Sequence, residues 1–240
     1  MIERNTSTQS NSTLEEETLA TISKMVYSNL AIENVWGKEE EELSKMIGKT
    51  QDFNTLLPLV QAVTWVNAFH YWREADFSLL FHAAISNNKV ALHLLLEAGA
   101  DPTLPNIRGT NVFMLFAKRG QVDMAEMCLA KVPKDKRAAV VNSTTTSGWS
   151  ALMTAAENNQ LESTKWLLKN GADVNTQMQG TLWTAGHAAS KRANLEILEL
   201  LLKNGASQDL LACHRDFGKN LRFSDVTTDE RVHQVLQRYP

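Results

Sequence analysis

The chain has 240 residues, of which 43% are apolar and 21% charged, the composition of an ordinary folded protein. Its 24 basic and 27 acidic side chains give a net charge of −3, which argues against nucleic acid or an anionic membrane surface as the partner. Two cysteines, Cys128 and Cys213, exclude a disulfide framework and a four-cysteine zinc site. We expect both thiols to be reduced, as in the cytoplasm.

The sequence predicts no membrane association. No uninterrupted apolar run approaches the roughly 18 residues of a membrane span. The beginning of the chain is rich in Asn, Ser and Thr and lacks the basic and apolar regions of a signal peptide. We therefore expect a cytoplasmic location.

The segment 1–74 is predicted to form a polar tail followed by helices. Residues 1–12 are polar, which favours a disordered tail. Thr13 and Glu16 form a capping-box pattern at the start of an amphipathic helix that is expected to end near Ala31. Residues 39–47 are predicted to form a shorter helix, and residues 55–73 a third one that is nearly apolar all round and well buried. Residues 13–74 are interpreted as a helical cap, the alternative being a separate binding module.

The rest of the chain repeats itself. Three segments end alike in a Leu-Leu pair followed by Gly-Ala, with glycines at Gly99, Gly171 and Gly205. The positions of Leu80 and Phe113 differ by 33, and so do those of Ala84 and Ala117. The step from Phe113 to Leu152 is 39, an insertion of six, and the step from Gly171 to Gly205 is 34, an insertion of one. A period of this length indicates an array of stacked supersecondary units.

A 33-residue period with Ala-Ala in a first helix and Leu-Leu before Gly-Ala in a second resembles the ankyrin-repeat family. The family's Thr-Pro-Leu-His tetrapeptide is most nearly matched by residues 184–187, whose His187 the resemblance makes structural. The other copies lack this histidine, and all lack the proline. The resemblance implies an all-α ankyrin solenoid over residues 75–240, with about four repeats and a degenerate capping repeat at residues 207–240.

Two further segments are predicted from local patterns. The six-residue insertion falls within residues 133–146, where we expect it to lengthen the second repeat by a helical turn and bend the stack. Near the C-terminus, Asp216 to Leu221 is expected to form a hairpin and first helix. A last helix is predicted from Asp229 to Arg238, with Thr228 as its N-cap and polar outer positions.

In ankyrin stacks, hairpin tips and inner helices line a concave surface, so the resemblance places candidate partner-binding residues there. Trp149 falls where the family presents a variable, exposed residue; packing against the next hairpin is the alternative. Tryptophan and arginine are enriched at binding hot spots. The predicted partner-binding residues are Arg108, Thr110, Lys118, Arg119, Trp149, Glu157, Asn158, Trp183, Lys191, Arg192 and Lys219.

We find no catalytic, cofactor or metal motif in the sequence. The neighbours Cys213 and His214 have no second Cys/His pair to complete a metal site. The predicted function is that of an adaptor or inhibitor, a monomer that binds another protein. Two alternatives stay open. The first is an enzyme whose active site involves the N-terminal helices. The second is a bacterial effector that acts in the cytoplasm of a host cell, because degenerate repeats behind a helical N-terminal segment without an ankyrin pattern resemble such effectors.

Overall fold

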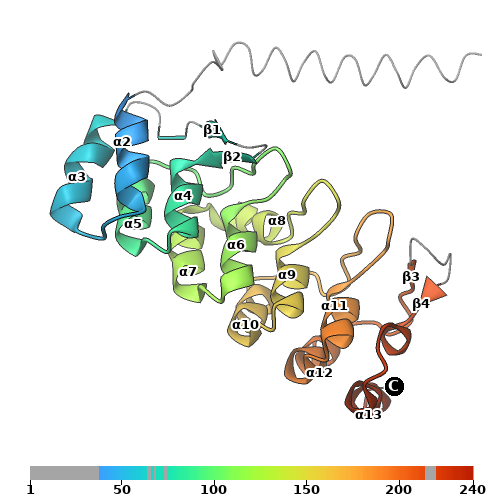
Figure 1. The fold of residues 1–240 in the computed structure, drawn as a ribbon. Coiled ribbons are helices and arrows are strands. Elements are labelled where there is room, and N and C mark those ends of the chain that lie inside the picture. The colour runs from blue at the N-terminus through green and yellow to red at the C-terminus, as the bar shows by residue number, and fades with distance from the viewer. Residues whose placement is uncertain (1–37, 64–65, 68, 73–74, 214–219, 240) are drawn as a thin grey trace, which may run out of the picture.

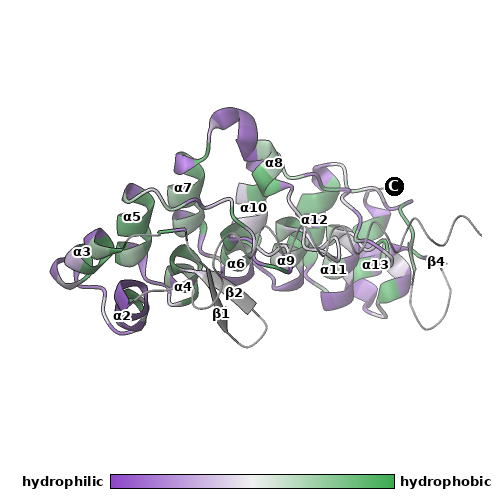
Figure 2. Ribbon diagram, turned by 90° about the horizontal axis from the view of Figure 1, so that it is seen from above, coloured by the Kyte–Doolittle hydropathy of each residue, from purple (hydrophilic) through white to green (hydrophobic). Residues whose placement is uncertain are grey.

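The computed structural model describes residues 38–63, 66–67, 69–72, 75–213 and 220–239. The predicted tail and the predicted helix from Thr13 to Ala31 lie outside them. The described chain is mostly helical with little strand, which confirms the predicted all-α solenoid. Its helices stand in two layers, and the loops before the inner helices project in a row on one side (Figures 1 and 2).

The inner layer contains the first helix of each repeat and the outer layer the second. The inner helices are α2 (Lys38–Ile47), α4 (Leu79–Ile85), α6 (Val112–Arg119), α9 (Ala151–Glu157) and α11 (Ala185–Arg192). The outer helices are α3 (Phe53–Ala62), α5 (Lys89–Glu97), α7 (Val122–Lys131), α10 (Leu161–Lys169) and α12 (Leu195–Lys203).

Polar N-caps fix where the inner helices begin. Ser78, Asn111, Ser150 and Thr184 each accept a hydrogen bond from the backbone N–H three residues on. The positions of these four caps differ by 33, 39 and 34, so the period read from the sequence is the spacing of the inner helices. The predicted glycines after the outer helices adopt positive φ, as Gly171 does at 85°.

The third predicted helix is wrong in its second half. Helix α3 ends at Ala62, and residues that were expected to continue it form strand β1 (Phe69–Trp72). This strand pairs antiparallel with β2 (Ala75–Ser78). The segment is rich in β-branched and aromatic residues, which favour a strand when a partner strand is available. Apolar character all round therefore did not distinguish a buried helix from a hairpin.

Helices α2 and α3 pack on the first repeat as one repeat packs on the next: α2 contacts α4, and α3 contacts α5. The buried amide of Asn88 donates to the carbonyls of Ile47 at 2.8 Å and Thr50 at 2.6 Å, at the end of α2. Asn194 makes the equivalent contact in the fourth repeat, to the Ala156 carbonyl at the end of α9. The helix pair thus occupies the place of a preceding repeat. Whether it is only a cap stays a prediction.

The insertion adds a short helix to the second repeat, as predicted, and does not extend α7. Helix α7 ends at Lys131, and the extra residues form a separate 3-10 turn (Lys134–Lys136) followed by the short helix α8 (Arg137–Val141). Proline at 133 has no backbone N–H to continue α7. The insertion is accommodated on the outer side, where α8 projects (Figure 2), and the inner layer continues from α6 to α9.

An asparagine at the start of several hairpins joins one repeat to the next. Asn142 donates to the Gly171 carbonyl at 2.7 Å and accepts from the Asp173 N–H at 2.7 Å. Asn67 makes the same pair of bonds with residues 99 and 101, and Asn175 with residues 205 and 207. Each amide satisfies one carbonyl and one N–H that the end of an outer helix leaves unpaired.

The C-terminal segment caps the stack. Strand β3 (Ala212–Cys213) pairs antiparallel with β4 (Asn220–Leu221), in agreement with the expected hairpin, and a 3-10 turn (Phe223–Val226) follows instead of the expected first helix. The last helix, α13 (Glu230–Gln237), matches its prediction apart from its N-cap, which is Asp229 rather than Thr228. The Asp229 carboxylate accepts from the Arg231 N–H, and its negative charge is favourable at the start of a helix. The outer positions of α13 are exposed and polar, as predicted.

We predict that Leu201→Ala lowers the free energy of unfolding by about 2–5 kcal/mol, because Leu201 is fully buried. Leu168 belongs to the same repeated Leu-Leu pairs in the sequence, but it is only half-buried. Leu168→Ala should therefore cost clearly less than Leu201→Ala. Urea unfolding measures both, and equal losses would contradict the packing described here.

Removing residues 1–74 should make the remainder aggregate, because α2 and α3 cover the apolar sides of α4 and α5 with side chains such as Leu43 and Leu56, both 0% exposed. Removing only residues 1–12 is the control and should leave folding intact. Size-exclusion chromatography and circular dichroism separate the two results. A monomeric, cooperatively folding fragment 75–240 would favour the separate-module alternative.

Candidate functional site

Successive hairpins are hydrogen-bonded to one another through their backbones. The Thr146 N–H donates to the Arg108 carbonyl at 3.0 Å, and the Gln179 N–H donates to the Ser147 carbonyl at 3.1 Å. The Cys213 N–H continues the series with a 2.7 Å bond to the Thr181 carbonyl. Four connections are thereby held side by side, and side chains at their tips keep a fixed spacing.

The inner helices expose one stripe of side chains at equivalent positions. In α6, Leu115 is half-buried, and Lys118 and Arg119, three and four residues on, are exposed. Residues at that spacing share a helix face. The equivalent residues of α9 and its C-cap, 39 positions later, are 154, 157 and 158, and those of α11, a further 34 later, are 188, 191 and 192; the first residue of each of these two sets is buried. We call these stripes and the hairpins before α6, α9 and α11 the inner face.

Two arginines of the inner face already have partners in the preceding repeat. Arg119 donates from Nη1 to the Ala84 carbonyl at 3.3 Å and to the Ile85 carbonyl, where α4 ends. Arg192 forms a 2.9 Å ion pair with Glu157. Both arginines therefore help to join repeats, and a partner would have to share or displace these contacts.

Both predicted hairpin tryptophans lie against the inner-face side of their own helix. Trp149 is half-buried, less exposed than the sequence suggested, and its indole N–H donates to the Thr154 hydroxyl at 2.9 Å. Trp183 is also half-buried, with the Lys191 ammonium 5.1 Å from its ring centroid. Each tryptophan precedes an N-cap, so the one-residue insertion does not shift Trp183 out of register.

The remaining predicted residues have varied surroundings. Arg108 is exposed on its hairpin, whereas Thr110 is half-buried and its N–H donates to the Asn106 side chain at 2.9 Å. The amide of Asn158 donates to a carbonyl of its own helix, that of Thr154, at 2.8 Å. Lys219 lies outside the described residues. Ten of the eleven predicted residues lie in the described part of the chain, and all ten are on hairpins or at inner-helix ends. Their positions do not test whether they bind a partner.

Sequence reasoning missed Leu182 as a surface residue. It is 39% exposed at a hairpin tip and adopts a left-handed φ of 56°. Ile107, at the tip of the hairpin before α6, is 44% exposed. The signal for Leu182 was the single insertion between Gly171 and Gly205, since an extra residue in a hairpin must be accommodated at its turn.

His187 is structural, as its resemblance to the family implied. Its Nδ1 lies 2.9 Å from the Thr184 hydroxyl, in a capping box, and its Nε2 lies 3.0 Å from the Leu221 carbonyl of the last repeat. The Phe223 ring stands edge-on to the imidazole at 4.7 Å. A side chain at Gly186 would overlap the Phe223 ring, so glycine is required there.

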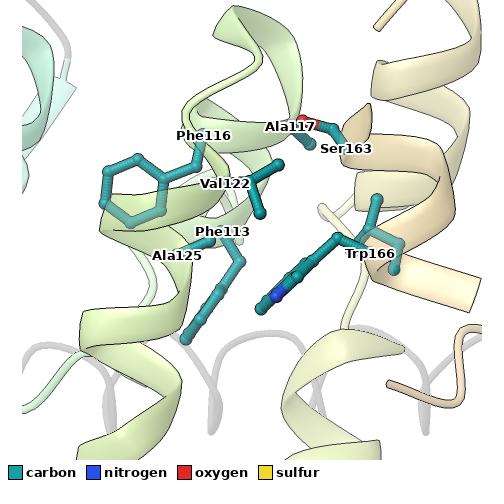
Figure 3. A pocket seen from close by; sticks show the side chains of 8 residues that line it. Phe113, Phe116, Ala117, Val122, Ala125, Ser163 and Trp166 are labelled. Atoms are coloured by element: carbon teal, nitrogen blue, oxygen red, sulfur yellow. The ribbon is translucent and has the colours of Figure 1, made fainter. Parts of the chain in front are cut away.

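The space between the second and third repeats is filled by side chains (Figure 3). Trp166 of α10 is buried and stacks on Phe113 of α6 with centroids 6.3 Å apart. The equivalent residues in two other repeats, Leu94 and Met127, are smaller. Burial raises the pKa of the nearby Cys128 thiol to about 12, which leaves it protonated at neutral pH.

Over the described residues no three His, Cys, Asp or Glu side chains gather as metal ligands would. Within the same part of the chain, none of the helices has the length and apolarity needed to cross a membrane.

The class of protein follows from these observations: a helical-repeat solenoid with projecting hairpins. Residues 80–178 match the family model described as ankyrin repeats (3 copies). These residues are therefore ankyrin repeats, and the resemblance seen in the sequence is confirmed. Ankyrin repeats generally mediate protein–protein interactions.

The chain is also similar to parts of curated proteins. It is 43% identical over 70 residues to the B-cell lymphoma 3 protein homolog of Mus musculus, covering 29% of this chain and 15% of that protein. It is 32% identical over 92 residues to BRCA1-associated RING domain protein 1 of Caenorhabditis elegans (38% and 12%). It is 27% identical over 150 residues to the nuclear factor NF-kappa-B p105 subunit of Gallus gallus (62% and 15%). The matched regions span only about a seventh of these relatives.

Stability should fall in mild acid. Burial lowers the pKa of His187 below its ordinary value of roughly 6.5, and burial does the same to His82 between α2 and α4. The unfolded chain therefore binds protons first, so the free energy of unfolding decreases as the pH falls below about 6.5. Urea unfolding at pH 7.5 and 5.5 measures the decrease. It should be smaller in His187→Gln, and an unchanged decrease would contradict this assignment.

Proposed function

We propose that this protein is a non-enzymatic binding module, an adaptor or inhibitor, that holds one partner protein on its inner face. The backbone bonds between successive hairpins are the observation that carries the proposal. They hold side chains from three repeats at fixed spacing on one surface, and a rigid, extended surface suits recognition of a protein because little conformational entropy is lost on binding.

The composition of the inner face also supports the proposal. Its tips expose Ile107 and Leu182, two of the three large apolar side chains that are exposed in the described chain. Half-buried Trp149 and Trp183 lie on hairpins of the same face. Apolar and aromatic side chains surrounded by charged groups are the usual composition of an interface. The expected cytoplasmic location and monomeric state are parts of this proposal, and the free thiols of Cys128 and Cys213 are consistent with the location.

The test is affinity capture of partners from a lysate by the wild type and by Ile107→Asn/Leu182→Asn. Asparagine tolerates the left-handed φ of residue 182. We expect capture by this variant to weaken by about tenfold, or about 1.4 kcal/mol, because two exposed apolar tips are lost.

Phe53→Asn is the matched control, since Phe53 is 47% exposed on α3, away from the inner face. It should capture the same protein as the wild type. Equal capture by all three proteins would show that the inner face is not the binding surface and would point to the outer layer or the N-terminal segment instead.

A further inference from the structure

The inner face is not electrically neutral. The last turns of α6, α9 and α11 carry four cations and a single carboxylate, that of Glu157. Glu157 is already paired with Arg192, so its charge is compensated within the stack. Lys118 is exposed and forms no ion pair with the described residues, and Lys191 contacts the Trp183 ring rather than a carboxylate.

The helix dipole alone does not account for these charges. Cations are favourable in the last turn of any helix, and Arg119 has that role for α4. The outer helices α7, α10 and α12 also end in lysines: Lys131 pairs with Glu97, Lys203 lies 3.9 Å from Glu199, and Lys169 has no ion pair within the described chain. Two of these three outer lysines therefore have acidic partners, whereas along the inner stripe of the described chain neither Lys118 nor Lys191 has one.

Apolar and basic groups form two parallel rows. The tips Ile107 and Leu182 precede the N-terminal ends of α6 and α11, and the cations lie at the C-terminal ends of the same helices. An inner helix of eight residues is about 12 Å long, which is close to the diameter of an α-helix with its side chains. Between the rows lie the half-buried side chains Leu115, Trp149 and Trp183.

We infer that the inner face takes an amphipathic helix of a partner protein, laid across the repeats, with acidic residues along one edge of its apolar side. The apolar side packs on the tryptophans and the hairpin tips, and the acidic edge faces Lys118, Arg119 and Lys191. In this mode of recognition a partner helix lies in a groove with its apolar side down. The complementary charges fix its rotation about its own axis, because only its acidic edge can face the inner-helix ends. The inference rests on the proposed function and specifies its partner.

The experiment uses the full chain and two labelled peptides of about five helical turns, or about 18 residues, each. Both carry leucines at i, i+3, i+4 and i+7 spacing, one with glutamates and the other with lysines along one edge. Fluorescence anisotropy should give about tenfold tighter binding of the glutamate peptide, weakened by added salt. Equal affinities of the two peptides, or tighter binding of the lysine peptide, would overturn the inference.

The matched variants are Lys118→Glu/Lys191→Glu on the inner face and Lys169→Glu on the outer layer, where Lys169 is exposed and has no ion pair within the described chain. The inner-face variant should bind the glutamate peptide about tenfold more weakly and the lysine peptide more tightly. Lys169→Glu should leave both affinities unchanged. An equal loss in Lys169→Glu would show that overall charge alone attracts the peptide, contrary to the inference.

The chain's own Glu15, Glu16 and Glu17 begin a predicted amphipathic helix and are the competing occupant. If the glutamate peptide binds only after these three residues are changed to lysine, the inner face is occupied by this chain itself and the partner inference is wrong. If peptide charge has no effect while Ile107→Asn/Leu182→Asn still loses its captured protein, the proposed function stands and only the inference fails.

Discussion

Close contact between neighbouring inner helices is the constraint on which the rest of the structure depends. Ala84, Ala117, Ala156 and Ala189 are at most 3% exposed, and their small side chains let α4, α6, α9 and α11 stand against one another. A repeat in isolation would leave these apolar surfaces in water, so each one is stable only beside its neighbours. Once the helices touch, exposed positions must recur in register, which is why the inner face is continuous across repeats of different length.

The second constraint comes from side-chain amides, which fix the positions of the hairpins. Asn142 makes the same two bonds as Asn67 and Asn175, although it lies at the end of the insertion. The inserted residues are therefore accommodated before this asparagine, in α8, and the following hairpin is undisturbed. A buried or helix-terminal backbone group that lost its partner would cost about 1–3 kcal/mol, so the amide positions tolerate little change.

Several candidate binding residues also hold the stack together. Arg119 caps α4, Arg192 pairs with Glu157, and Trp149 bonds to Thr154. Replacing any of them affects stability as well as the surface, and their effects on binding are difficult to interpret alone. Lys118, Ile107 and Leu182 are exposed at the same face with fewer structural contacts, so they report on binding more directly.

The sequence by itself determined the period, the helical repeats and the position of the candidate residues on hairpins and inner-helix ends, because these depend on spacing along the chain and recur in every repeat. The family resemblance also assigned His187 its structural role correctly. Tertiary structure alone decided the rest. The segment after Ala62, rich in β-branched and aromatic residues, forms a hairpin because a partner strand is available to it. Leu168 is half-buried although it belongs to a repeated Leu-Leu pair, and Arg119 caps a helix of the preceding repeat. Those outcomes depend on which surfaces and unpaired carbonyls a neighbouring repeat presents, and that information lies a whole repeat away along the chain rather than in the local pattern.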